Sequence, residues 1–254
     1  MTPEEMVSRL LYRDGLMLVI DKPAGMAVHR GSPNSKDRAR ESLEDHFGTL
    51  CFGLPRPPAL AHRLDRDTSG CLVLGRHRKA LAELGKLFRN GAIGKTYWAV
   101  VEGTPPADEG QIELPLGRLD DKIGWWMKHD PNGQPSVTKW KVMGRAASSS
   151  LTWLALEPLT GRTHQLRVHC AEMGWPILGD AIYGKAPRTG GPPLHLHARE
   201  IVVPLYKNRE PIKITAPVPA HLREFLTQCG WRGEDPAIAD QVTGNGVPIS
   251  RSSL

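Results

Sequence analysis

The sequence predicts an α+β fold dominated by antiparallel sheet, and three observations support this prediction. Most apolar runs are short and are typical of strands, because strands span about 4–8 residues. Few stretches show the three-to-four-residue spacing of an amphipathic helix. The polar segments between these runs carry the side chains that could take part in binding or catalysis, as expected for loops at a sheet. The 254 residues allow one large domain or two small ones.

In the first half of the chain, the strongest strand is 16–20, and a turn rich in Pro and Gly follows it at 22–25. Residues 42–47 indicate a short helix capped by Ser42. The apolar run 71–74 predicts a buried strand. Leucines and a phenylalanine at helical spacing then predict an amphipathic helix that starts in the basic segment 76–79 and ends near Asn90-Gly91.

The second half alternates short strands with turns. The predicted elements are strands at 97–101 and 112–116, a hairpin of 138–142 with 151–156, a helix at 163–172, a loop at 184–193, strands at 194–203 and 212–216, and a helix at 219–226 with Pro at its start. We predict a catalytic domain over 1–232. The segment 233–254 is polar, has no apolar period and is predicted to be a disordered tail.

Composition narrows the class of protein. The formal net charge of +6 permits a polyanionic partner without requiring one. No apolar run reaches the 18 residues of a membrane span, and the acidic N-terminus is no signal peptide. The four Cys are scattered without metal-finger spacing, which indicates free thiols in a reducing compartment, so we expect a cytoplasmic protein.

The most informative stretch is 62–70, which reads HRLDRDTSG and precedes the buried run 71–75. Asp65 lies between Arg63 and Arg66, whose positive charges favour its ionised form. An ionised and positioned carboxylate can act as a nucleophile or a base. The residues alone leave a second interpretation open, in which the Arg and Asp side chains only form a salt-bridged turn.

Six segments together resemble the RluA family of RNA pseudouridine synthases. Residues 62–70 resemble its HRLDxxTSG motif. The other five are 21–26 (DKPAGM), 95–101 (KTYWAVV), 161–169 (GRTHQLRVH), 176–180 (PILGD) and 196–198 (LHA), which occur in the order found in that family. The resemblance implies a pseudouridine synthase fold, with a central mixed or antiparallel sheet flanked by helices and loops and an RNA-binding cleft.

The resemblance also implies roles for single residues. Asp65 matches the catalytic aspartate, Arg167 the arginine that pairs with it, and Tyr97 the active-site tyrosine, although a strand tyrosine can equally fill a core. Arg63 matches the arginine that takes the place of the extruded base. The substrate-binding residues that complete the prediction are Leu196 in the base pocket, His62 as a support of the loop, Arg66 beside Asp65, and Lys95 and Arg162 toward phosphate or local carboxylates.

The implied reaction isomerises uridine within an RNA and needs no cofactor, and the sequence carries no nucleotide-binding Gly-rich motif. The His residues lack zinc-ligand spacing, so no metal is expected. Only 15 residues precede the first core strand, too few for a separate RNA-binding domain, as in the short branch that includes RluA and TruC. We therefore expect loops such as 29–40 and 117–135 to recognise tRNA, large-subunit rRNA or both, and the protein to act as a monomer.

Two other hypotheses remain at this stage. One is a catalytically silent RNA-binding protein on the same fold. Asp65, Tyr97 and Arg167 argue against it, because binding alone does not require all three. The other is a hydrolase that uses Asp65 with a second carboxylate such as Asp67, for which no partner pocket is evident.

Overall fold

The computed structural model describes residues 1–31, 39, 41–120 and 126–234. The chain forms two compact units. Unit 1 contains 1–94, 198–217 and Glu234, and unit 2 contains 95–197 and 218–233. Whether they act as one catalytic domain over 1–232 stays a prediction, and the predicted tail lies almost entirely outside the described residues.

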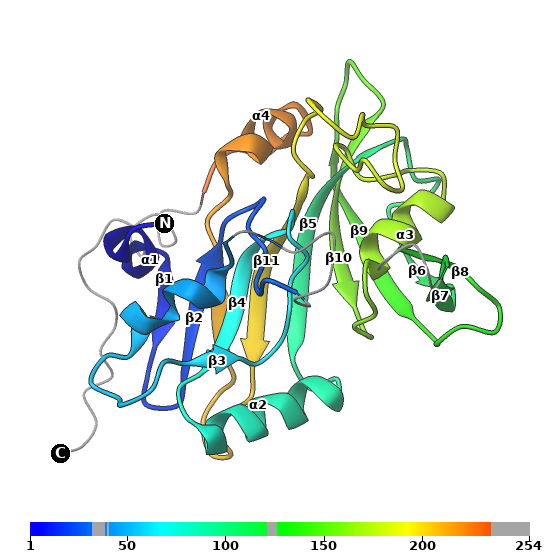
Figure 1. Cartoon of the computed structure of the whole chain (residues 1–254). Helices are drawn as coiled ribbons and strands as arrows, with labels where there is room; N and C mark the ends of the chain where they lie inside the picture. Colours follow the sequence, from blue (N-terminus) through cyan, green and yellow to red (C-terminus); the bar gives the residue numbers. More distant parts are fainter. Residues whose placement is uncertain (32–38, 40, 121–125, 235–254) are drawn as a thin grey trace. The chain divides into compact units, whose positions relative to one another are not determined.

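Unit 1 is built around a β-sheet. Its elements are α1 (Pro3–Ser8), β1 (Leu10–Arg13), β2 (Met17–Lys22), the 3₁₀ helix η1 (Leu43–Leu50), β3 (Ala59–Leu60), β4 (Ser69–Gly75), α2 (Arg78–Arg89), residues 198–203 of β11 (Leu196–Val203) and β12 (Ile212–Thr215). The strands lie in the order β1–β2–β4–β11, with β3 paired to β4 and β12 paired to β11 (Figure 1). The pairs β1–β2, β2–β4, β3–β4 and β11–β12 are antiparallel.

The core of unit 1 forms because β2 and β4 are nearly continuous apolar runs. All of β4 is buried, and in β2 only Asp21 is partly exposed. Leu84 of α2 packs against these strands as the helical spacing predicts. The core side chains are Met17, Val19, Cys71, Val73, Leu84, Ile93, Ile201, Val203, Ile214 and Ala216.

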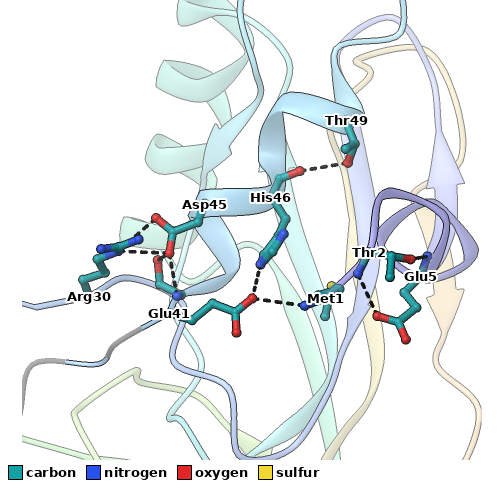
Figure 2. Close-up of polar contacts among 9 residues, drawn as sticks. Met1, Thr2, Glu5, Arg30, Glu41, Asp45, His46 and Thr49 are labelled. Atoms are coloured by element: carbon teal, nitrogen blue, oxygen red, sulfur yellow. Dashed lines mark hydrogen bonds and ion pairs between the residues drawn. The ribbon is translucent and has the colours of Figure 1, made fainter.

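Polar contacts attach the N-terminus to η1 (Figure 2). The Met1 amino group lies 3.1 Å from a Glu41 carboxylate oxygen, which is also 2.6 Å from His46 Nε2. Nearby, the Arg30 Nε–H donates to both oxygens of Asp45 at 3.0 Å. Arg30 was one of the basic residues of the predicted RNA-binding loop 29–40, and its guanidinium is engaged in this ion pair. Residues 32–38 and 40 of that loop lie outside the described residues.

Unit 2 contains a second group of antiparallel strands. Its elements are residues 95–102 of β5 (Gly94–Glu102), β6 (Glu109–Glu113), β7 (Leu116–Arg118), β8 (Met127–His129), β9 (Val137–Arg145), β10 (Leu151–Pro158), α3 (Gln165–Glu172) and α4 (Ala220–Gln228). Strands β5–β10–β9–β6 are neighbours in this order, and β7 pairs with β8 (Figure 1). Aromatic and aliphatic side chains from these strands pack against Leu166 and Cys170 of α3.

Most elements predicted from the sequence are confirmed, including β2, β4, α2, the β9–β10 hairpin, β11, β12 and α4. The single strand predicted at 112–116 was wrong, because β6 ends at Glu113 and β7 begins at Leu116 after Pro115, which has no N–H for a ladder. The helix predicted at 163–172 begins only at Gln165, since His164 has a left-handed backbone with φ 52°.

Candidate active site

The loop that carries Asp65 is held where it enters β4. Leu64 is buried, Asp65 is half-buried, and the Thr68 N–H donates to the Asp65 carbonyl at 3.2 Å. This bond closes a turn that places Asp65 shortly before the first strand residue, Ser69. The prediction that the charged segment lies on a loop leading into the 71–74 strand is confirmed.

Gly70 allows the end of this loop to lie close to the neighbouring strand β11. Its φ is +105°, and a Cβ at this position would lie 2.3 Å from the carbonyl oxygen of Ala198. A side chain would therefore require both a strained backbone and a displacement of β11. Glycine at this position therefore lets the Asp65 loop join β4 directly beside Ala198 of β11.

Lys22, a fully buried lysine at the end of β2, holds the loop in place through hydrogen bonds. Its ammonium donates to the carbonyl oxygens of Pro23 at 2.7 Å, Met26 at 2.7 Å and Arg66 at 2.8 Å. These bonds use the three donor hydrogens of a protonated lysine. Burial lowers the pKa of Lys22 to about 7, while nearby carboxylates, including that of Asp65, oppose the shift. The sequence places Lys22 in a turn and in the 21–26 motif, and it does not predict this role.

His62 is held at the start of the same loop by two contacts. The Val73 N–H donates to its Nε2 at 3.0 Å, so Nε2 is an acceptor and the ring proton lies on Nδ1. The ring also stacks on Phe88 of α2 with centroids 4.4 Å apart. Both contacts tie the first residue of the motif to the core of unit 1.

The two arginines that flank Asp65 are exposed. Arg66 forms an ion pair with Asp67 through bonds of 3.1 and 3.3 Å. The salt-bridged turn that we kept as an alternative is therefore present for these two residues. Asp67, the second acid of the hydrolase hypothesis, takes part in this pair.

In unit 2, Arg167 and Asp180 form a buried bidentate ion pair. Arg167 Nε and Nη2 each lie 2.8 Å from one oxygen of the carboxylate, and the side chains are only 5% and 1% exposed. The backbone N–H groups of Ile182 and Tyr183 donate to the same carboxylate at 2.9 and 3.0 Å. Burial tends to raise the pKa of Asp180, but Arg167 and the two N–H groups hold it below its usual value.

Tyr183 completes the surroundings of Arg167. The guanidinium carbon lies 5.2 Å from the centroid of the Tyr183 ring. The Tyr183 hydroxyl accepts from the Met127 N–H at 2.8 Å and lies 2.8 Å from His164 Nδ1, to which it can donate. The left-handed backbone of His164 directs the chain into α3 at this point. The sequence does not predict a role for Tyr183, and it shows His164 and Asp180 only as members of the short motifs 161–169 and 176–180.

Tyr97 and Leu196, two of the predicted base-pocket residues, belong to one apolar cluster of unit 2. Leu196 is 3% exposed, and the partly buried Tyr97 ring packs against this cluster. Lys95 is partly buried, which lowers its pKa. Arg162 is exposed, and its Nε–H donates to the Pro135 carbonyl at 3.2 Å.

Asp65 belongs to unit 1, whereas Tyr97, Arg167 and Leu196 belong to unit 2. Within unit 2, Tyr97 and Leu196 share one apolar cluster, whereas Arg167 is paired with Asp180. The ion pair of Asp65 with Arg167 that the sequence predicts therefore stays a prediction. Among the described residues, no group of three or more His, Cys, Asp or Glu is arranged to hold a metal ion. No helix in the described ranges is long and apolar enough to cross a membrane.

Residues 16–172 match the protein family described as RNA pseudouridylate synthase. The chain belongs to the RluA-type RNA pseudouridine synthases. An uncharacterized RNA pseudouridine synthase of Zymomonas mobilis is 42% identical over 218 residues, which cover 84% of this chain and 95% of that protein. Ribosomal large subunit pseudouridine synthase C of Vibrio cholerae is 35% identical over 230 residues, covering 86% of this chain and 68% of its own length.

Solved structures agree with these relatives. The human RNA Pseudouridylate Synthase Domain Containing 4 superposes with a TM-score of 0.72 at 27% identity, covering 89% of this chain and 95% of the human chain. The predicted pseudouridine synthase fold is confirmed. The protein is an RNA pseudouridine synthase, hence an isomerase, and the hydrolase and the catalytically silent RNA-binding protein are set aside.

Proposed function

We propose that this pseudouridine synthase modifies specific uridines in large-subunit rRNA, tRNA or both, with Asp65 as the catalytic carboxylate. The observation that carries the proposal is the construction of the Asp65 loop. A buried lysine, a histidine and a glycine fix this loop on the sheet, and the loop presents Asp65 as a half-buried carboxylate. Large-subunit rRNA is the first candidate substrate to test because the Vibrio cholerae relative is named for that RNA.

The reaction breaks the N1–C1′ bond of uridine, turns the base and forms a bond from C5 to C1′. A proton leaves C5 and N1 gains one, so atoms balance without an oxidant or hydrolysis. The Asp65 carboxylate would act at the sugar, either by attack at C1′ or by removal of a proton. Tyr97 would stack on the base and assist proton transfer. Arg167 would hold and orient the charge of Asp65.

The target uridine must leave its stack before it can react. Arg63 is exposed and lies two residues before Asp65, a suitable place to fill the vacated position with its planar guanidinium. Leu196 would contribute to the apolar wall of the base pocket. His62 and Arg66 would support the loop, and Lys95 and Arg162 would approach phosphate.

The test uses unmodified transcripts of large-subunit rRNA and of tRNA, incubated with the protein or with Asp65→Asn. Pseudouridine is then mapped by carbodiimide treatment and primer extension. We expect new stops with the wild-type protein and none with the variant, which should still bind RNA. Normal modification by Asp65→Asn would refute the assignment of Asp65. Stops confined to one transcript would identify the substrate.

A further inference from the structure

Unit 1 contains a groove that the reaction described above does not use. It has a volume of about 440 Å³ and lies between the segment 54–59 and the start of α2. Its apolar wall is formed by Leu54, Pro55, Pro57, Ala59 and Leu81. Gly75 at the end of β4 lets the start of α2 lie close to the strand beside the groove, because a Cβ there would lie 2.8 Å from the backbone of Leu81.

The rim of the groove is basic. Arg56, Arg78 and Lys79 are exposed, and Arg76 and His77 also line it. Among the described residues that form the groove, none is acidic. An apolar floor under several cations is complementary to a nucleotide, whose base is apolar on its faces and whose phosphate is negative.

The start of α2 adds to the positive potential. Arg78 and Lys79 occupy its first turn, which contains no acidic residue, and His77 caps it by accepting the Ala80 N–H at 3.3 Å. Cations at this end of a helix are unfavourable beside the partial positive charge of the helix dipole. Below them, Arg76 donates to the carbonyls of Asp14, Cys51 and Phe52, so its charge is fixed in place. A bound phosphate would relieve this concentration of positive charge.

The groove is separated from the Asp65 loop by the length of β4. The loop joins the strand at Ser69, whereas the groove lies at Gly75. Seven strand residues at about 3.3 Å each place the two ends about 20 Å apart. This distance corresponds to about six stacked nucleotides at a rise of 3.4 Å. A ligand in the groove is therefore a different nucleotide from the target uridine.

We propose that the groove is a second RNA contact, which binds a nucleotide of the substrate outside the reaction site. Its base would lie on the apolar floor, and its phosphates would contact Arg56, Arg78 and Lys79. This inference rests on the proposed function for the identity of the RNA. It explains how a catalytic unit could recognise RNA beyond the target uridine.

The test compares two double variants of the same helix. Arg78→Gln with Lys79→Gln removes two rim charges, and Lys86→Gln with Arg89→Gln removes two exposed charges from the last turn as a control. Dissociation constants for unmodified large-subunit rRNA and tRNA transcripts are measured at several salt concentrations. The rim variant should bind about tenfold more weakly, and its salt slope should fall by about 1.4, the value for two contacts to single-stranded phosphates. The control should lose much less affinity.

A third variant tests the apolar floor without changing charge. Ala59→Leu fills the groove from β3, and should weaken binding about tenfold while it leaves the salt slope unchanged. The proposal would be overturned if the rim and control variants had equal dissociation constants for RNA and Ala59→Leu bound RNA as tightly as the wild-type protein. The groove would then not be an RNA contact. Failure of the proposed function is a separate result, because the wild-type protein would then form no pseudouridine in either transcript.

Discussion

The guanidinium of Arg167 and the carboxylate of Asp180 form two parallel hydrogen bonds of 2.8 Å inside unit 2. Asp180 is itself fixed by two backbone N–H groups, so the pair is attached to the chain at both ends. An arginine held in this way presents its remaining donors in a fixed direction. Asp180 is therefore a positioning residue for Arg167.

Asp180→Asn should reduce both stability and turnover. The substitution leaves the buried Arg167 charge without its carboxylate, and breaking such a pair costs about 3–5 kcal/mol. Unfolding by urea gives the loss of stability, and kcat against KM separates an effect on chemistry from one on RNA binding. The matched control is Tyr183→Phe, which keeps the ring near Arg167 but removes the hydroxyl. If Asp180→Asn kept normal kcat, the positioning role would be excluded.

Lys22→Met should loosen the Asp65 loop. The variant keeps most of the side chain's length but leaves three buried carbonyls without their donor, and an unsatisfied buried group costs about 1–3 kcal/mol. Hydrogen exchange of the Thr68 amide, which closes the turn at Asp65, should become faster at temperatures where the protein stays folded. Unchanged protection of that amide would show that the loop is held by other contacts.

Gly70→Ala should destabilise unit 1 by about 3 kcal/mol or more, because it combines a strained backbone with overlap on the Ala198 carbonyl. The control is Gly25→Ala in the same unit, where φ is +83° but nothing lies within 4 Å of the added Cβ. That change should cost only about 1–2 kcal/mol. Similar melting temperatures for the two variants would contradict the argument from close approach.

The stability of unit 2 should decrease as the pH falls below about 6.5. His169 is fully buried, its Nδ1 accepts from the Thr138 hydroxyl at 2.9 Å, and Nε2 lies 3.1 Å from the Leu114 carbonyl. Burial lowers its pKa, so the folded state binds fewer protons than the unfolded state below the ordinary histidine pKa. The stabilisation is thus complete above this pH and is lost as the pH falls.

The check for His169 is the urea midpoint at pH 7.5 and pH 5.5, for the wild-type protein and for His169→Gln. The wild-type protein should lose more stability between the two pH values, because the variant no longer titrates at this position. His195 and His221 also have lowered pKa values from burial and remain in both proteins. Parallel profiles would show that His169 does not contribute.

The sequence predicted those parts of the fold that depend on local patterns. Strands β2 and β4 are apolar runs, and the leucine spacing of α2 is visible within one segment. Asp65 was found through its charged motif and the resemblance. Such signals need no knowledge of which distant residues meet.

The remaining site residues could not be predicted because their partners lie far away in the chain. A lysine after a strand is ordinarily exposed, and only the fold brings Lys22 to the Arg66 carbonyl, 44 residues later. Asp180 similarly follows an apolar run and precedes a loop, with no sign that Arg167 points to it. A charged residue directly after a buried run was the available signal in both cases, but it does not identify a partner.

The anchoring of β8 to Tyr183 has a consequence for how such enzymes diverge. The Leu119 N–H donates to the Trp126 carbonyl at 2.8 Å, and the Met127 N–H donates to the Tyr183 hydroxyl at 2.8 Å. The base of the segment between β7 and β8 is therefore tied to the side chain that packs beside Arg167. Insertions or deletions beyond this tie can accumulate during evolution while the arginine keeps its orientation. A change of length in this segment would then leave the geometry around Arg167 unaltered.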